Sequence, residues 1–199
     1  MRKLLLFVLL IPVFAFGEVE ITTVHDSPNE IKIQMTLEGL LSKYNLEQWI
    51  YVTEVKVDET ASTPHSHPVL TMSTGEEYLQ SEMKLLASFL HEQFHWHLVK
   101  NGTAGREEYR AIIKTQFPAF KSERPFGSGT EGSTLSHIVV CYLEYKAFRD
   151  LVGEELATEI LSKKSYYTWV YATILDPSNE SKLEALINNY GLQIPTKNG

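Results

Sequence analysis

Residues 75–100 read GEEYLQSEMKLLASFLHEQFHWHLVK, and this stretch decides the fold. Its apolar side chains recur at intervals of three and four residues, which is the spacing of one face of an α-helix. They are Leu79, Met83, Leu86, Leu90, Phe94 and Leu98. Glu76 and Glu77 favour a helix start, since acidic side chains are stabilised near the N-terminal end of the helix dipole. We therefore predict one helix from about residue 75 to about residue 100, ending before Asn101 and Gly102.

The same stretch contains an H-E-x-x-H pattern, formed by His91, Glu92 and His95. Positions four apart share one face of a helix, so both imidazoles can reach one metal ion. Such a pair typically binds Zn2+, and the glutamate between the histidines then serves as general base in metal-assisted hydrolysis. We expect His91 and His95 to be zinc ligands and Glu92 to be catalytic. The alternative is two half-buried histidines on an ordinary amphipathic helix.

A second buried helix can supply the third ligand, because catalytic zinc normally keeps three protein ligands and one open position. The segment 135–151 is apolar on nearly every side, and His137 and Glu144 interrupt its middle. We expect Glu144 to be the third ligand, since a buried carboxylate without a partner would be costly. His137 is the alternative ligand; otherwise it lines the site or contacts substrate. Without a metal, Glu144 would form an ion pair with one of the nearby basic residues Lys146, Arg149 or Arg110.

With these two motifs the chain resembles the zincin metallopeptidases, and within them the gluzincins. In that group H-E-x-x-H is followed by a glutamate on a later helix, commonly with an alanine three residues on. Glu144 and Ala147 match this second motif loosely. The resemblance implies a sheet before the active-site helix, with an edge strand that binds an extended peptide, here residues 69–73. The chain departs from the family at Leu143, where an asparagine is common, and at Phe148, where an acid can orient a histidine ligand.

The resemblance also implies a side chain that stabilises the oxyanion, which is often a tyrosine or a histidine. The candidates are Tyr166, Tyr167, Tyr145 and His137. The tyrosine-rich segment 165–171 is more typical of core packing than of catalysis. The glycine-rich loop 126–133 is either a lid over the site or a plain connector.

Three further histidines lie near the motif. His65 and His67 stand in a loop bounded by prolines, and we expect a solvated loop there, with a second metal site as the alternative. His97 points away from His91 and His95 on a helix, so we expect it on the surface.

The N-terminus has the pattern of a signal peptide, with Arg2 and Lys3 before an apolar run that ends at Phe16. We expect residues 1–17 to be removed after Gly17, and an uncleaved anchor is the alternative. Residues 18–199 then form one domain of ordinary size, secreted or periplasmic, without a membrane span. The formal charge of −7 argues against nucleic acid and anionic membranes as partners. The one cysteine, Cys141, excludes an internal disulfide, and no pattern indicates an oligomeric state.

Strand patterns precede the long helix and helical patterns follow it. We expect strands within 18–24, 30–35, 49–57 and 69–73, and helices over 107–117, 133–151, 153–163, 165–175 and 178–190. The fold class is therefore α+β, with a small N-terminal β-sheet, the H-E-x-x-H helix and a mostly helical C-terminal part, zincin-like in arrangement. The expected function is that of a zinc metallopeptidase acting on a peptide or protein substrate. The alternatives are a non-catalytic zincin-like binding module and a structural domain with an accidental motif.

Overall fold

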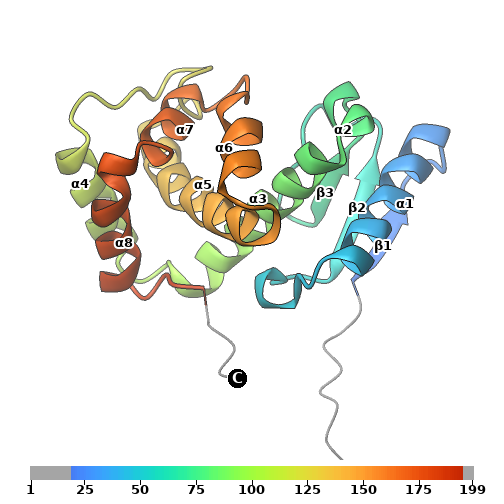
Figure 1. Ribbon diagram of the computed structural model, residues 1–199, viewed down its shortest axis with the longest axis horizontal. Helices are drawn as coiled ribbons and strands as arrows, with labels where there is room; N and C mark the ends of the chain where they lie inside the picture. Colours follow the sequence, from blue (N-terminus) through green and yellow to red (C-terminus); the bar gives the residue numbers. More distant parts are fainter. Residues whose placement is uncertain (1–18, 195–199) are drawn as a thin grey trace, which may run out of the picture.

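The computed structural model describes residues 19–194, and it places a small sheet before a mostly helical remainder (Figure 1). This arrangement confirms the predicted α+β class. The predicted signal peptide, residues 1–17, lies outside the described residues. Over the range that is described, no helix has the length and apolar character needed to cross a bilayer.

The sheet has three parallel strands in the order β1-β2-β3. They are β1 (Glu20–Thr23), β2 (Glu54–Asp58) and β3 (Leu70–Ser73). Parallel neighbours require a crossover connection, and α1 (Pro28–Lys43) supplies it between β1 and β2. Val55 pairs with Leu70 and Val57 with Met72, and all four side chains are fully buried. The sheet therefore buries one face under α1, as the packing of α1 against β1 and β2 shows (Figure 1).

The predicted strand over residues 30–35 is wrong, because this segment lies inside α1. Ser27 caps the helix with its hydroxyl, which accepts from the backbone N–H of Glu30 at 3.3 Å, and Pro28 occupies the first turn. The buried apolar residues continue at helical spacing beyond the segment; they are Ile33, Leu37 and Leu40. Alternation over six residues was too short to outweigh the cap and this longer period.

The predicted long helix is present but broken into α2 (Glu76–Gln80) and α3 (Glu82–Asn101). Ser81 has extended backbone angles at the break, and its hydroxyl accepts from the N–H of Lys84 at 3.3 Å. All of residues 85–94 are buried. Helix α3 is therefore the central element of the fold, and it runs between the sheet and the later helices (Figure 1).

Five further helices follow at the places where the sequence predicts them. They are α4 (Arg106–Gln116), α5 (Glu131–Val152), α6 (Glu154–Ser162), α7 (Thr168–Ile174) and α8 (Glu180–Asn189), and short 3-10 turns lie at Glu47–Trp49 and Pro177–Asn179. Thr130 begins α5 by accepting the N–H of Ser133 at 3.4 Å. Helix α5 packs along α3, so two buried helices face each other at the centre of the molecule.

Two polar residues of α3 fix its position against the rest of the chain. The side-chain oxygen of Gln93 accepts from the backbone N–H groups of Tyr51 and Val52, at 2.8 and 3.0 Å, and its amide donates to the Val52 carbonyl at 2.9 Å. His97 was expected on the surface, and this expectation is wrong. The side chain is 1% exposed, with Nε2 3.0 Å from the Leu192 carbonyl, because the C-terminal segment covers this face of α3.

Candidate metal centre

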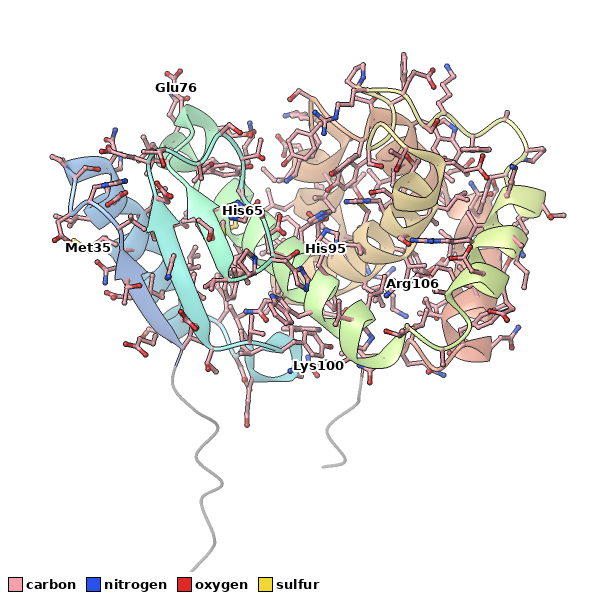
Figure 2. The ribbon with its side chains drawn as sticks, turned by 180° about the vertical axis from the view of Figure 1, so that it is seen from behind. Met35, His65, Glu76, His95, Lys100 and Arg106 are labelled. Atoms are coloured by element: carbon pink, nitrogen blue, oxygen red, sulfur yellow. The ribbon has the colours of Figure 1, made fainter. Side chains whose placement is uncertain are left out.

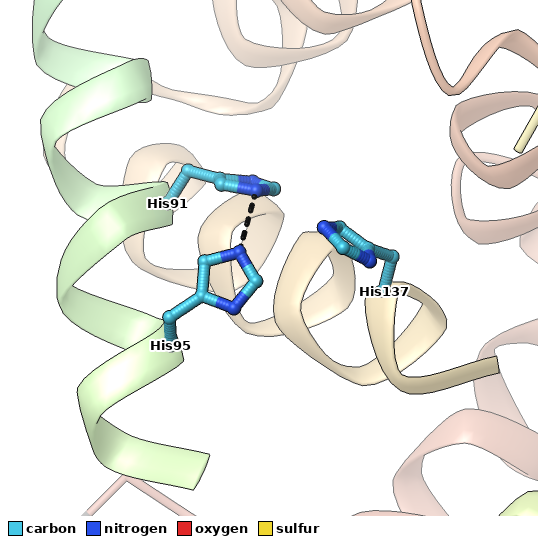
Figure 3. Close-up of side chains that lie close together, drawn as sticks. All are labelled: His91, His95 and His137. Carbon is cyan, nitrogen blue, oxygen red and sulfur yellow. Dashed lines mark hydrogen bonds between the residues drawn. The ribbon is translucent and has the colours of Figure 1, made fainter. Parts of the chain in front are cut away.

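Three imidazole rings from two helices converge at one point (Figure 3). His91 and His95 lie one turn apart on α3, and their Nε2 atoms are 3.2 Å apart. His137 comes from the second turn of α5, and its ring centroid is 5.6 Å from that of His91 and 4.9 Å from that of His95. One nitrogen from each ring lies within 4.8 Å of the other two. Nitrogen ligands of a tetrahedral zinc ion stand about 3.3 Å apart, given Zn–N bonds of about 2.0–2.1 Å, so the three rings suit one such ion.

His91 is oriented by a carboxylate on the opposite helix. Its Nδ1–H donates to Oε2 of Glu144 at 2.8 Å, and the hydroxyl of Tyr171 donates to the same oxygen at 2.8 Å. This hydrogen bond places the proton on Nδ1 and leaves the lone pair of Nε2 directed toward His95. Such a carboxylate behind a ligating histidine is the usual way to hold a metal-binding tautomer.

His137 is held in the same tautomer by the backbone. Its Nδ1 lies 2.7 Å from the carbonyl oxygen of Ser133, one turn earlier on α5, so Nδ1 carries the proton and donates it. The lone pair on Nε2 is then free. His91 and His137 therefore each direct an unprotonated Nε2 into the space between the three rings.

The geometry favours His137 over Glu144 as the third ligand. Glu144 contacts Nδ1 of His91, the nitrogen opposite the one that faces His95. Glu144 does form a possible metal group with His91 and Cys141, but His95 is not part of that group. An ion on that side would also displace the hydrogen bond between His91 and Glu144. This arrangement therefore does not support the expectation that Glu144 binds the same ion as His91 and His95. It places Glu144 where it orients the ring of His91.

A cleft of about 550 Å³ opens above the three rings. Its base contains His91, Glu92, His95 and His137, and Ser88 lies beside them. One wall is the segment 62–66, and Figure 2 shows His65 and His95 where the sheet side and the helical side face each other. The opposite wall contains Arg124, Pro125, Gly127, Tyr166 and Tyr167. A larger hollow of about 900 Å³ lies beside the C-terminal end of α1 and includes none of these residues.

The segment 62–66 takes the place that the resemblance gives to an edge strand. His65 pairs antiparallel with Thr71 of β3, with backbone hydrogen bonds of 3.0 and 2.8 Å. The outer edge of β3 is thus already bonded at this point, and 62–66 faces the cleft instead. Neither His65 nor His67 belongs to a metal-binding group within residues 19–194.

The opposite wall is fixed by close packing and hydrogen bonds. The N–H groups of Thr168 and Trp169 donate to the carbonyls of Pro125 and Phe126, both at 3.1 Å. A Cβ on Gly127 would lie 2.5 Å from a backbone carbonyl, so only glycine fits there. Tyr167 has a left-handed backbone (φ 55°) that brings its ring to 4.4 Å from the ring of His137. These contacts favour a fixed wall over a lid for the glycine-rich loop.

Burial sets the charge state of the site. It lowers the pKa of His91 to about 3 and that of His137 to about 4, so both rings are neutral and can bind a metal at pH 7. Burial, together with the charge of Glu144, raises the pKa of Glu92 to about 8. Burial likewise raises the pKa of Glu144 to about 7, against the opposing charge of Lys164 and the hydrogen bond from Tyr171.

Two residues near this site, Lys164 and Tyr171, are not predicted from the sequence. Tyr171 lies in the tyrosine-rich segment, which is more typical of core packing, and nothing in its spacing marks it as a partner of Glu144. Lys164 follows Lys163, and no local pattern distinguishes the buried lysine from the exposed one. Cys141 is fully buried, as expected of a small apolar side chain.

A zinc-binding measurement distinguishes the two candidates for the third ligand, His137 and Glu144. We expect His137→Ala to lose stoichiometric zinc, because only two nitrogens remain. Glu144→Gln should keep one zinc per chain with affinity lowered about 10- to 100-fold, since it only orients His91. Elemental analysis and competition with a chromogenic chelator measure both quantities. His65→Ala is the control and should bind like the unaltered chain. Zinc lost in Glu144→Gln and retained in His137→Ala would contradict this assignment.

The buried groups also predict a pH profile for protein stripped with a chelator. Histidines with lowered pKa values stabilise the fold less as the pH falls below about 6.5, because the unfolded chain binds more protons there. Glu92 and Glu144 have raised pKa values, so the stability they contribute is lost as the pH rises through about 7 and 8. We expect the free energy of unfolding to peak near pH 6.5 and to fall by about 2 kcal/mol by pH 8. Urea unfolding at pH 5, 6.5 and 8 measures it, and Glu92→Gln should remove most of the alkaline fall. If the free energy of unfolding stays constant above pH 6.5, then Glu92 and Glu144 are not protonated in the folded chain at that pH.

Comparison with known proteins adds no assignment to this geometry. No protein-family model matches the chain, and neither a curated protein nor a solved structure matches it.

Proposed function

We propose that this chain is a zinc-dependent hydrolase that cleaves peptide or related amide bonds. The observation that supports this most is the convergence of three neutral imidazoles at the base of a cleft, with a buried glutamate beside them. His91, His95 and His137 would bind the ion and leave a fourth position open toward the cleft. Bound zinc supplies an acidified water and polarises the carbonyl that is attacked.

Glu92 is the general base in this proposal. It follows His91 directly, lines the cleft and is 6% exposed, so few waters compete for its carboxylate. The carboxylate accepts a proton from the attacking water and delivers it to the leaving amine. A glutamate whose burial already favours the protonated form suits the second of these transfers, because it holds the proton until the amine departs.

The oxyanion donor is one of two tyrosines. Tyr166 and Tyr167 both line the cleft, whereas Tyr145 is not among the residues that line it. His137 was a further candidate, and its place beside His91 and His95 supports a role as metal ligand instead. A phenol hydroxyl can donate to an oxyanion without a change of charge in the ground state.

The size of the cleft and the resemblance support a peptide as substrate. Residues 62–66 and Arg124, Pro125 and Gly127 line the cleft together with the histidines, and its volume is about 550 Å³. The likeness to the zincins rests on the H-E-x-x-H motif, while three histidines replace the two histidines and glutamate of the gluzincins. The basic start and apolar run of residues 2–16 support export, so we propose that the hydrolase acts outside the cytoplasm.

Replacement of the base tests the proposed function. We expect Glu92→Gln to lower kcat on internally quenched peptides by a factor of about 10²–10⁴, because the proton transfers lose their carrier. Zinc content should remain one per chain, since the ligands are unchanged. Glu82→Gln is the control, because this exposed glutamate lies ten residues earlier on the same helix.

The rival explanations give different results. Full activity in Glu92→Gln would contradict the mechanism. A chain that binds zinc stoichiometrically and shows no chelator-sensitive hydrolysis of any peptide would be a binding module. A chain that binds no zinc would be a structural domain with an accidental motif.

A further inference from the structure

Lys164 is a buried cation without a carboxylate partner. It lies between α6 and α7 and is 7% exposed. Its ammonium donates to the hydroxyl of Tyr166 at 3.2 Å, and among residues 19–194 it takes part in no ion pair. Its neighbour Lys163 is exposed and pairs with Glu159 at 2.7 Å. Burying a charge without an ionic partner is costly, so a lysine at position 164 works against stability unless it serves the site.

Tyr166 connects this cation to the cleft. Its hydroxyl accepts from Lys164 and lies 3.3 Å from the hydroxyl of Tyr78, and its side chain lines the cleft with His91 and Glu92. An ammonium group can only donate, so the Tyr166 oxygen is the acceptor in that bond, and the Tyr166 proton is not used in it. With Tyr78 donating to the same oxygen, the Tyr166 proton can be directed at a substrate. A hydroxyl that accepts from a cation is a stronger donor in its next hydrogen bond, because the bonds polarise each other.

Tyr167 has a different environment. Its ring packs on His137, and the two residues after it, Thr168 and Trp169, donate backbone hydrogen bonds to the loop wall, whereas the ammonium of Lys164 contacts Tyr166. Of the two tyrosines that line the cleft, Tyr166 is therefore the one whose hydroxyl is polarised by a buried charge.

We propose that Lys164 is a positioning residue that acts through Tyr166, and that the Tyr166 hydroxyl donates the hydrogen bond that stabilises the oxyanion formed on the substrate carbonyl. This inference rests on the proposed hydrolase function and adds the identity of the donor and of the residue behind it. The positive charge of Lys164 also acts on Glu92 and Glu144, which is a second route by which it could affect the reaction. A double-mutant cycle separates the two routes.

The experiment uses the zinc-loaded full chain with Lys164→Met, Tyr166→Phe and the double variant, and measures kcat and KM on one peptide. We expect Tyr166→Phe to lower kcat about 100-fold, as loss of one oxyanion donor does. Lys164→Met should lower kcat about 10-fold with KM changed less than about twofold, because the effect is confined to the transition state. The double variant should match Tyr166→Phe alone, since Lys164 then has no hydroxyl to polarise. Lys163→Met is the matched control and should behave like the unaltered chain.

Stability and zinc content distinguish this role from a structural one. Methionine in place of a buried, unpaired ammonium should leave the thermal midpoint unchanged or raise it. If Lys164→Met is unstable, Lys164→Gln keeps a donor of similar length and replaces it in the cycle. An unchanged kcat in Tyr166→Phe or in the lysine variant would overturn the inference. Losses that multiply in the double variant would also overturn it, because Lys164 would then act by another route. Absence of chelator-sensitive hydrolysis in the unaltered chain would overturn the proposed function and this inference together.

Discussion

The hydrogen bond between Nδ1 of His91 and Oε2 of Glu144 connects the two buried helices on which the site depends. It fixes the ring angle of His91, and it determines which of its nitrogens is free. The same contact aligns α5 with α3, so that His137 lies opposite His91 and His95. A carboxylate here is costly to bury, and its second oxygen has no hydrogen-bond partner among the described residues. This cost falls at the residue that sets the orientation of His91, the proposed metal ligand.

The polar groups around this bond form one buried cluster of opposing charges. Burial raises the pKa of both Glu92 and Glu144, and the charge of Glu144 raises that of Glu92 further, while Lys164 acts on both in the opposite direction. A dication held by three neutral imidazoles would favour the ionised form of both acids. Metal binding would therefore stabilise the folded state, and the charge states of Glu92 and Glu144 would depend on the bound ion.

Most of the helices and strands, and the H-E-x-x-H motif, could be predicted from the sequence. The α+β class, the helices after residue 100 and the pairing of His91 with His95 follow from periodicity and spacing. The alternation of apolar and polar residues over 30–35 led to a wrong strand prediction. Ser27 and Pro28 mark a helix start there, and an alternation of six residues does not reveal it. The exposure of His97 was also misjudged, since its cover comes from Leu192, about 95 positions away along the chain.

The choice between His137 and Glu144 as third ligand of the proposed zinc ion could not be made from the sequence, for a specific reason. His137 and Glu144 are both polar interruptions of one buried helix, and either chemistry suits zinc. The choice depends on which nitrogen of His91 each side chain faces, and that is set by the rotation of α5 against α3. Tyr171 was missed for the same reason, because its contact with Glu144 depends on the packing of α7 against α5. Lys164 was missed because its burial depends on tertiary packing, which no local pattern reveals.

The proposed metal centre is defined by the atoms that bind zinc. X-ray absorption at the zinc edge of the zinc-loaded chain identifies these atoms directly. We expect three imidazole nitrogens and one light atom at about 2.0–2.1 Å, and no sulfur. A sulfur at about 2.3 Å would place the ion on the Cys141 side of His91. Scattering from only two imidazoles, with a carboxylate in the shell, would return Glu144 to the ligand set and contradict the three-histidine centre.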